Sequence, residues 1–166
     1  AIFTIPTLQN PTTTTMPAGR RRAIAEIAER HDVLIVEDDV YGALKPDAPP
    51  PLLTFAPDRT LYLTSVSKSI APSLRVGMMV VPSALHARLS VAIHTLIWMA
   101  SPILVETFRT LVRSGAADDI LARHRRHVRL RNDSARRKLG NAAGGSDPDA
   151  MNLWFPLPEG WTSGEF

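Results

Sequence analysis

The sequence of 166 residues contains no cysteine, so disulfide bonds are excluded. No apolar run approaches the roughly 20 residues that a membrane-spanning helix needs. The N-terminus lacks the basic and then apolar pattern of a secretory signal. Only two tyrosines are present, and Tyr62 lies in an apolar segment where a core position is expected, which leaves Tyr41 as the functional candidate. From these absences we expect a cytoplasmic protein with no membrane partner.

The most informative residue that is present is a lysine in a polar loop. Lys68 follows the apolar segment 61–64, which predicts a buried strand, and open α/β sheets bind ligands at the carboxyl ends of their strands. It is flanked by Ser65, Ser67 and Arg75, and hydroxyl and guanidinium groups bind phosphate. An amine beside a phosphate site suits Schiff-base formation with an aldehyde, which points to pyridoxal 5′-phosphate. Taken alone, the segment also fits an ordinary loop lysine and a surface arginine.

Two further polar sets follow predicted strands. Segment 33–36 leads into Asp38 and Tyr41, and segment 2–5 leads into Asn10. Because the carboxyl ends of parallel strands share one edge, we expect all three sets to meet at one edge of a sheet. Each set has a local alternative: adjacent aspartates can simply begin a turn, and an Asn-Pro pair can be a turn signal only.

The three sets combine into a recognisable series of motifs. In chain order these are Asn10-Pro11, Asp38-x-x-Tyr41 and Ser65-x-Ser67-Lys68 with Arg75. The series resembles the signature of fold-type I pyridoxal-phosphate enzymes. Within that superfamily the chain is similar to the aminotransferase-like domain of GntR/MocR-type transcriptional regulators and to aminotransferases of the kynurenine and 2-aminoadipate type. The similarity extends over nearly the whole chain.

The resemblance implies a role for each motif residue. Lys68 would hold the cofactor as an internal aldimine and act as the general acid/base. Asp38 would keep the pyridine nitrogen protonated, while Tyr41 and Asn10 would donate hydrogen bonds to the phenolic oxygen of the cofactor. The residues expected to hold the phosphate are Ser65, Ser67 and Arg75.

The sequence departs from the family pattern in two places. The family usually has glycine after Asn-Pro-Thr, whereas this chain has Thr13, and we expect the turn near Asn10 to change. Many regulator domains also carry a longer acidic and aromatic run after the paired aspartates. Segment 40–43 of this chain is more like the aminotransferases.

The expected fold class is α/β: a partial large domain of the fold-type I transferase fold, with three α/β/α layers and a mainly parallel sheet. Strands are predicted over 1–6, 33–37, 60–64 and 75–81, and helices over 17–31, 83–98, 101–114 and 117–139. The first helix should cover the sheet with Ile24, Ile27 and Ala28. Only a short loop precedes the last strand, so that strand should be antiparallel.

The chain is expected to be a fragment, since complete fold-type I enzymes need well over twice its length. Residues 1–141 would be a partial cofactor-binding large domain that includes a bridging helix at 117–139. An Ala-Ala-Gly-Gly linker at 142–145 marks the boundary, and 147–166 would begin a truncated small domain. By resemblance the missing parts supply a glycine-rich phosphate loop, a ring-stacking aromatic residue and a carboxylate-binding arginine, so this piece is not expected to transaminate.

Most of the net charge of +3 comes from arginine-rich segments at 20–22 and 117–139. Clustered arginines can contact nucleic-acid phosphates, but a long solvated helix between two domains is the favoured interpretation. His124 and His127 have a helical spacing that metal ligands can use. No acidic or cysteine partner lies near them in the sequence, so a solvated pair and no metal site are expected.

Three functions from different classes remain open. The first is an effector-sensing domain of a regulator, which binds DNA only through a missing N-terminal domain. The second is an aminotransferase that moves an amino group from an amino acid to a 2-oxo acid. The third is a cofactor-free dimerisation fragment. The expected partners are a small-molecule amine or amino acid and a second copy of the chain, and a helix-turn-helix segment in the complete reading frame would favour the first function.

Overall fold

One four-stranded mixed sheet organises the protein, for which the computed structural model describes residues 1–140 and 145–164. Its strands, in spatial order, are β1 (Ile2–Thr4), β2 (Ile35–Asp38), β3 (Thr60–Ser65) and β4 (Gly77–Val80). The first three are parallel, and β4 runs antiparallel to β3. The α/β class and the antiparallel last strand are therefore confirmed.

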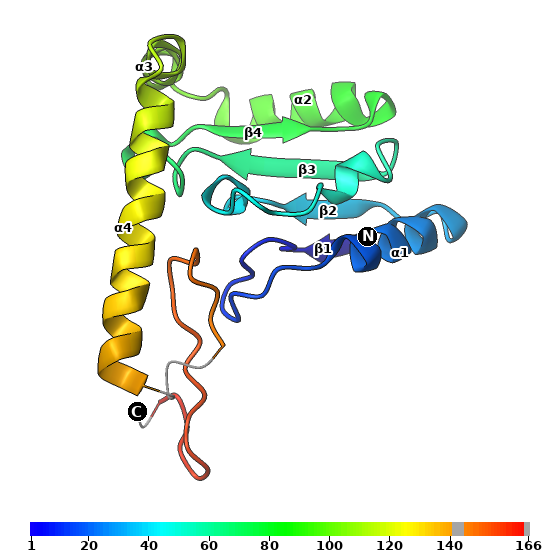
Figure 1. Cartoon of the computed structure of the whole chain (residues 1–166). Coiled ribbons are helices and arrows are strands. Elements are labelled where there is room, and N and C mark those ends of the chain that lie inside the picture. The colour runs from blue at the N-terminus through cyan, green and yellow to red at the C-terminus, as the bar shows by residue number, and fades with distance from the viewer. Residues whose placement is uncertain (141–144, 165–166) are drawn as a thin grey trace.

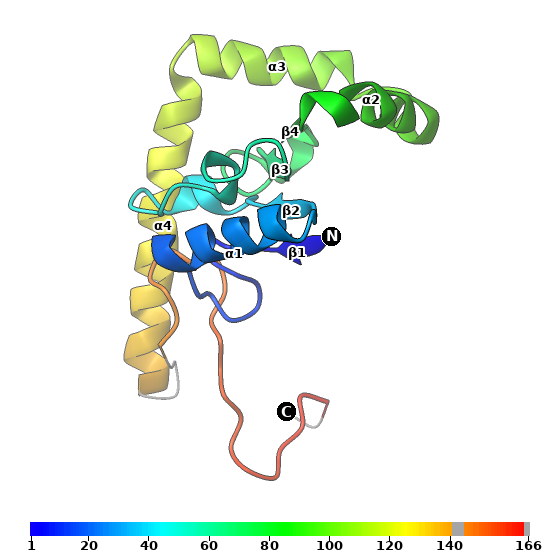
Figure 2. The same cartoon turned by 90° about the vertical axis from the view of Figure 1, so that its right-hand side faces the viewer.

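Four helices accompany the sheet: α1 (Ala18–Arg30), α2 (Ser83–Ile97), α3 (Pro102–Arg113) and α4 (Ala116–Leu139). Three short 3-10 helices occupy the loops at Gly42–Leu44, Leu52–Thr54 and Pro72–Leu74. α4 stands across the edge of the sheet at which β1, β2 and β3 end (Figure 1). Viewed from the opposite edge, α1 lies beside β1 and β2 (Figure 2). Of the predicted linker, residues 142–144 lie outside the described residues.

The first and last predicted strands are shorter than expected by three residues each, for local reasons. β1 ends before Pro6, which has no N–H to donate to a neighbouring strand. β4 begins only at Gly77, because Arg75 has a φ of 49°, in the left-handed region that interrupts a strand.

The core beside α1 is built from small residues. Ala25 and Ala28 pack against Ile35 of β2 and against the loop residues Leu52 and Ala56. The prediction that Ile27 covers the sheet is wrong, since its side chain is 46% exposed. The buried residues of α1 are at positions 21, 25 and 28, a stripe with helical spacing that passes beside position 27.

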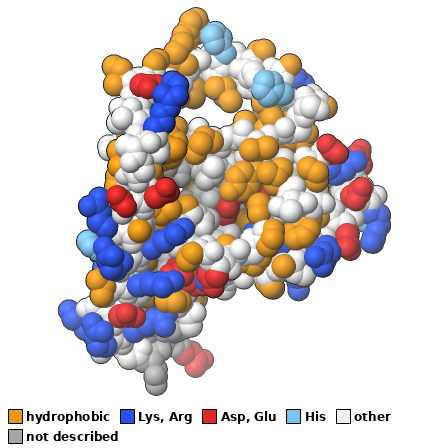
Figure 3. Space-filling model, turned by 45° about the horizontal axis from the view of Figure 1, so that its top comes forward, with side chains coloured by type: hydrophobic (Ala, Val, Ile, Leu, Met, Phe, Trp, Pro, Cys, Tyr) orange, Lys and Arg blue, Asp and Glu red, His pale blue; other side chains and the backbone are white. Residues whose placement is uncertain are grey.

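Helices α2 and α3 contain no buried residues, and they carry exposed apolar side chains such as Leu96 and Ile103. Among the described residues, no single helix is long and apolar enough to cross a membrane. Only α2 and α3 taken together, bent by 120°, reach that length and composition. On another side of the molecule, Lys and Arg side chains gather along α4 (Figure 3).

Candidate functional site

The edge of the sheet at which the parallel strands end carries three loops. Thr4 of β1 pairs with Glu37 of β2, and Asp38 pairs with Leu63 of β3, so the three strands end at nearly the same level. The loop after β1 contains Asn10. The structure therefore places all three sequence-predicted sets on loops that leave one edge of the sheet.

The turn that carries Lys68 is well anchored. The N–H groups of Ile70 and Ala71 both donate to the carbonyl of Val66, at 2.8 and 3.0 Å. Val66 itself is buried in an apolar cluster that receives Phe108 and other side chains of α3. Lys68 lies within this turn and is half-buried. The packing of the turn therefore limits how far the lysine can move.

The expected phosphate-binding residues belong to one hairpin. Ser65 pairs with Gly77 of β4, and the N–H of Val66 donates to the carbonyl of Val76 at 3.1 Å. Ser67 and the exposed Arg75 therefore both lie in the loop that connects the two strands of the hairpin. Hydroxyls and a guanidinium in such an arrangement suit a phosphate group.

The turn after β2 carries the expected carboxylate and phenol. Asp38 is the last residue of β2, and its Oδ1 accepts a hydrogen bond from the N–H of Val40 at 3.3 Å. Tyr41 is half-buried and packs against the cluster that contains Leu8 and Leu44. Leu8 belongs to the loop after β1, so this apolar contact joins two of the three loops.

Asn10 is exposed and precedes a cis peptide bond to Pro11. Thr13, which stands where the family pattern has glycine, has a φ of 63°. This left-handed conformation is the one that glycine favours, and it costs other residues about 1–2 kcal/mol. The buried Thr13 hydroxyl accepts a hydrogen bond from the N–H of Asp147 at 2.9 Å, a contact that glycine could not make.

Helix α4 contacts the loops after β2 and β3, which corrects the prediction that both histidines of this helix are solvated. Nδ1 of His124 lies 3.4 Å from the carbonyl of Ser69, next to Lys68, and Nε of Arg125 donates to the carbonyl of Ala43 at 2.9 Å. Both side chains are half-buried. His127 is exposed, and the described residues contain no group of three or more His, Asp or Glu side chains that could hold a metal ion.

The segment after α4 folds back between that helix and the loop after β1 (Figure 1). Asn132 of α4 donates from Nδ2 to the carbonyls of Pro148 and Ala150, at 2.8 and 2.7 Å. Arg129 forms an ion pair with the buried Asp149. The arginine-rich helix is thus partly a structural support, although sequence reasoning treated its charges alike.

A buried ion pair beneath the loops was also missed. Arg21, within the arginine run at 20–22, is only 1% exposed and lies 3.8 Å from the fully buried Glu37. Burial raises the pKa of Glu37, and hydrogen bonds from the N–H groups of Leu52 and Leu53, at 2.8 and 3.0 Å, oppose that rise. A signal was present in the sequence: Arg21 lies on the same helical face as Ala25 and Ala28, which are also buried.

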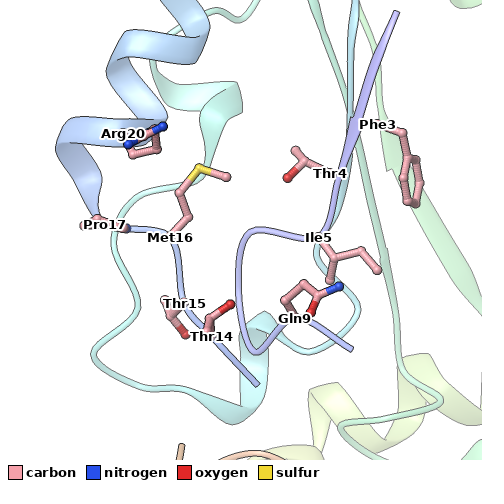
Figure 4. Close-up of a pocket in the computed structure, with 9 residues that line it drawn as sticks. All are labelled: Phe3, Thr4, Ile5, Gln9, Thr14, Thr15, Met16, Pro17 and Arg20. Carbon is pink, nitrogen blue, oxygen red and sulfur yellow. The ribbon is translucent and has the colours of Figure 1, made fainter. Parts of the chain in front are cut away.

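A pocket of about 560 Å³ opens beside β1, and Lys68 is not among the residues that line it (Figure 4). Its lining residues are Phe3, Thr4, Ile5, Gln9, Thr14, Thr15, Met16, Pro17 and Arg20. Arg20 is the only ionisable side chain among them, so the pocket lacks a carboxylate and an amine that could form a Schiff base. We therefore assign the candidate site to the three loops and not to this cavity.

The fold and the loops together define a class of protein. Side chains with the groups needed to bind a phosphorylated aldehyde lie on loops at one edge of a mainly parallel sheet: an amine, a carboxylate, and a hydroxyl and guanidinium set. The chemistry of this donor set fits pyridoxal 5′-phosphate, so the class is that of the pyridoxal-phosphate-dependent transferases.

Comparison with known proteins gives the family. The chain matches the model of the aminotransferase class I and II family over residues 1–141 and belongs to that family. It is 31% identical over 166 residues to YdeF, an uncharacterized HTH-type transcriptional regulator of Bacillus subtilis, with 99% of this chain and 36% of YdeF covered. It is 36% identical over 104 residues to the mitochondrial kynurenine/alpha-aminoadipate aminotransferase of Rattus norvegicus, with 61% and 24% covered.

A solved kynurenine aminotransferase from Pyrococcus horikoshii has the same arrangement. It superposes with a TM-score of 0.87 at 26% identity, covering 98% of this chain and 42% of the enzyme. The chain therefore spans less than half of the length of these relatives. What it contains is an aminotransferase-like part of a pyridoxal-phosphate protein.

Proposed function

We propose that this chain is the cofactor-binding part of an HTH-type transcriptional regulator of the GntR/MocR kind. The observation that supports this most is the similarity to YdeF, which extends over 99% of the chain. In such a protein the cofactor site senses a small amine or amino acid, and a separate N-terminal domain binds DNA. The protein acts as a homodimer, as we expect from the resemblance.

The side chains of the site divide the work between them. When bound, the cofactor would supply an electrophilic aldehyde carbon and a ring nitrogen that can carry a proton, and Lys68 would be the residue that holds the aldehyde carbon. Asp38 holds that proton through its negative charge. Tyr41 and Asn10 orient the ring by donating hydrogen bonds, and the Lys68 amine moves a proton at the Cα of an incoming amine. The phosphate is held by Ser65, Ser67 and Arg75.

Covalent trapping tests the assignment of Lys68. The full-length protein is incubated with pyridoxal phosphate, reduced with borohydride and digested, and the modified peptide is identified by mass. We expect the pyridoxyl group on Lys68, its loss in Lys68→Ala, and its retention in Lys138→Ala, which changes an exposed lysine at the end of α4. A wild-type protein without an adduct on Lys68 would refute the assignment.

The role of Asp38 is tested separately from cofactor capture. Asp38→Ala should leave the borohydride adduct on Lys68 in place, because the amine is untouched. It should strongly slow the absorbance change that an amino acid produces in the bound cofactor, because the ring nitrogen loses its carboxylate partner. Unchanged rates after this substitution would contradict the proposed role.

A free-standing aminotransferase is the second candidate, and the similarity to the Pyrococcus horikoshii enzyme favours it. The two are separated by measuring amino-group transfer to a 2-oxo acid and DNA binding on the same full-length protein. Turnover without DNA binding would support the enzyme, whereas amine-dependent DNA binding would support the regulator. Dimer formation with no adduct on Lys68 would favour a cofactor-free dimerisation role.

A further inference from the structure

Beneath the candidate site lies a cluster of polar side chains that the proposed function does not use. We call it the buried polar network, and it consists of Thr7, Arg21, Glu37, Asp39 and Tyr62. The first four are between 0% and 8% exposed, and Tyr62 is half-buried. Burying charged groups costs several kcal/mol each unless partners compensate, so the contacts of this network need an explanation.

One end of the network fixes the loop after β1. Nε of Arg21 donates to the carbonyl of Met16 at 2.9 Å, and its NH2 group donates to the carbonyl of Pro6 at 3.1 Å and to the hydroxyl of Thr7 at 3.0 Å. The N–H of Met16 also donates to the carbonyl of Pro6 at 2.7 Å. Both ends of the segment that contains Asn10 are therefore held by one guanidinium.

The other end of the network fixes the turn after β2. The hydroxyl of Tyr62 on β3 donates to Oδ2 of Asp39 at 2.8 Å, whereas the buried Oδ1 of this carboxyl has no hydrogen-bond partner among the described residues. Burial raises the pKa of Asp39, and the hydrogen bond from Tyr62 opposes that rise. Gly42 closes the turn over the carboxyl, since a Cβ there would lie 2.1 Å from Oδ2.

Arg21 joins the two ends, because its guanidinium donates to the Thr7 hydroxyl at 3.0 Å and lies 3.8 Å from Glu37, two residues before Asp39. Asp39 directly follows Asp38, and Thr7 lies three residues before Asn10. We propose that the buried polar network is a positioning element of the cofactor site, which holds the turn at 38–42 against the loop at 7–12. This inference rests on the proposed function, and none of its members needs to touch the cofactor.

Two substitutions in β3 of the full-length protein separate positioning from general stability. Tyr62→Phe removes the hydroxyl that holds Asp39. Thr60→Val is the matched control: Thr60 is the first residue of the same strand, and its fully buried hydroxyl donates at 2.8 Å to the carbonyl of Ala56, which precedes the strand. Both variants lose one hydrogen bond of a partly or fully buried hydroxyl, so both should lower the melting temperature.

Only Tyr62→Phe should change the cofactor site. We expect its dissociation constant for pyridoxal phosphate to rise about tenfold, the scale of one hydrogen bond to a charged group. The pH midpoint of the visible absorption band of the bound cofactor should also shift, since Asp38 and Tyr41 lie on the turn that is released. Thr60→Val should keep the wild-type dissociation constant and absorption band.

A second pair of variants tests the same point from the other loop. Thr7→Val should reproduce the effect of Tyr62→Phe, and Thr7→Ser, which keeps a hydroxyl, should restore wild-type binding. The inference is overturned if Tyr62→Phe and Thr7→Val bind the cofactor as the wild type does while losing only thermal stability. A wild-type protein that forms no adduct on Lys68 would instead refute the proposed function, so the two failures are distinguishable.

Discussion

Replacing Arg21 by methionine removes the buried guanidinium of α1 but keeps a long side chain in its place. The guanidinium lies 3.8 Å from the fully buried Glu37. At an effective dielectric constant of about 20 such a pair attracts by about 4 kcal/mol. Removing one partner of a buried pair typically costs about 3–5 kcal/mol. We therefore expect Arg21→Met to lower the free energy of unfolding by about 4 kcal/mol, a large share of the stability of a domain.

The size of this loss should depend on pH. Burial raises the folded-state pKa of Glu37 above its ordinary value of 4.5, and Arg21 opposes the rise. A carboxyl group with a raised folded-state pKa contributes most to stability when it is protonated. This contribution is complete at pH values below the unfolded-state pKa, and it is lost as the pH rises through the folded-state pKa. Without Arg21 the pKa of Glu37 should rise further. The pKa of Asp39 should also rise, because the charge of Arg21 lowers it in the wild type. Arg21→Met should therefore lower the free energy of unfolding by less at a pH of about 5 than at a pH of about 8.

The assay is urea unfolding followed by far-UV circular dichroism at both pH values. Arg20→Met, the same substitution at the neighbouring exposed position, is the control and should change stability by less than about 0.5 kcal/mol. A double-mutant cycle with Glu37→Gln should give a coupling energy of about 2–3 kcal/mol between the two positions. A loss below about 1 kcal/mol, or an equal loss at both pH values, would refute the argument from a buried ion pair.

Two further predictions concern the packing of the loops. Gly42→Ala should lower the free energy of unfolding by about 1–3 kcal/mol, because the new methyl group would overlap Oδ2 of Asp39; thermal unfolding that matches the wild type would contradict this. Asn132→Leu should leave two backbone carbonyls of segment 148–150 without their donor and cost about 2 kcal/mol. Limited proteolysis should then cut segment 148–150 faster in Asn132→Leu than in the control Asp133→Ala, which changes an exposed neighbour. Equal cleavage rates in the two variants would show that Asn132 does not hold this segment.

The order and type of the main elements could be predicted from local patterns. Apolar runs of strand length and helical periodicity depend on nearby residues only, so the positions of β2, β3 and the four helices agree with prediction to within about two residues. The antiparallel direction of β4 also followed from the sequence, because a short connection cannot return the chain to the starting edge. The prediction of the buried face of α1 failed at Ile27, because hydrophobicity alone does not show how large a side chain fits between the helix and the sheet.

The candidate site was accessible to sequence reasoning because its residues follow strand ends. Lys68, Asp38 and Asn10 each lie shortly after an apolar run, and parallel strands bring such positions to one edge whatever the details of packing. His124 and Arg125 were not accessible in this way. They reach the loops from α4 and contact residues 55 and 82 positions away in the chain.

The sequence by itself determined the α/β fold, the direction of the last strand and the lysine with its neighbouring polar motifs. Only the tertiary structure decided which charges are structural. Arg21 lies in a run of three arginines that are equivalent in the sequence, yet it alone is buried, with hydrogen-bond partners 5 to 29 residues away. Local pattern fixes periodicity and strand ends, whereas the burial of a charge depends on distant partners that meet only when the chain has folded.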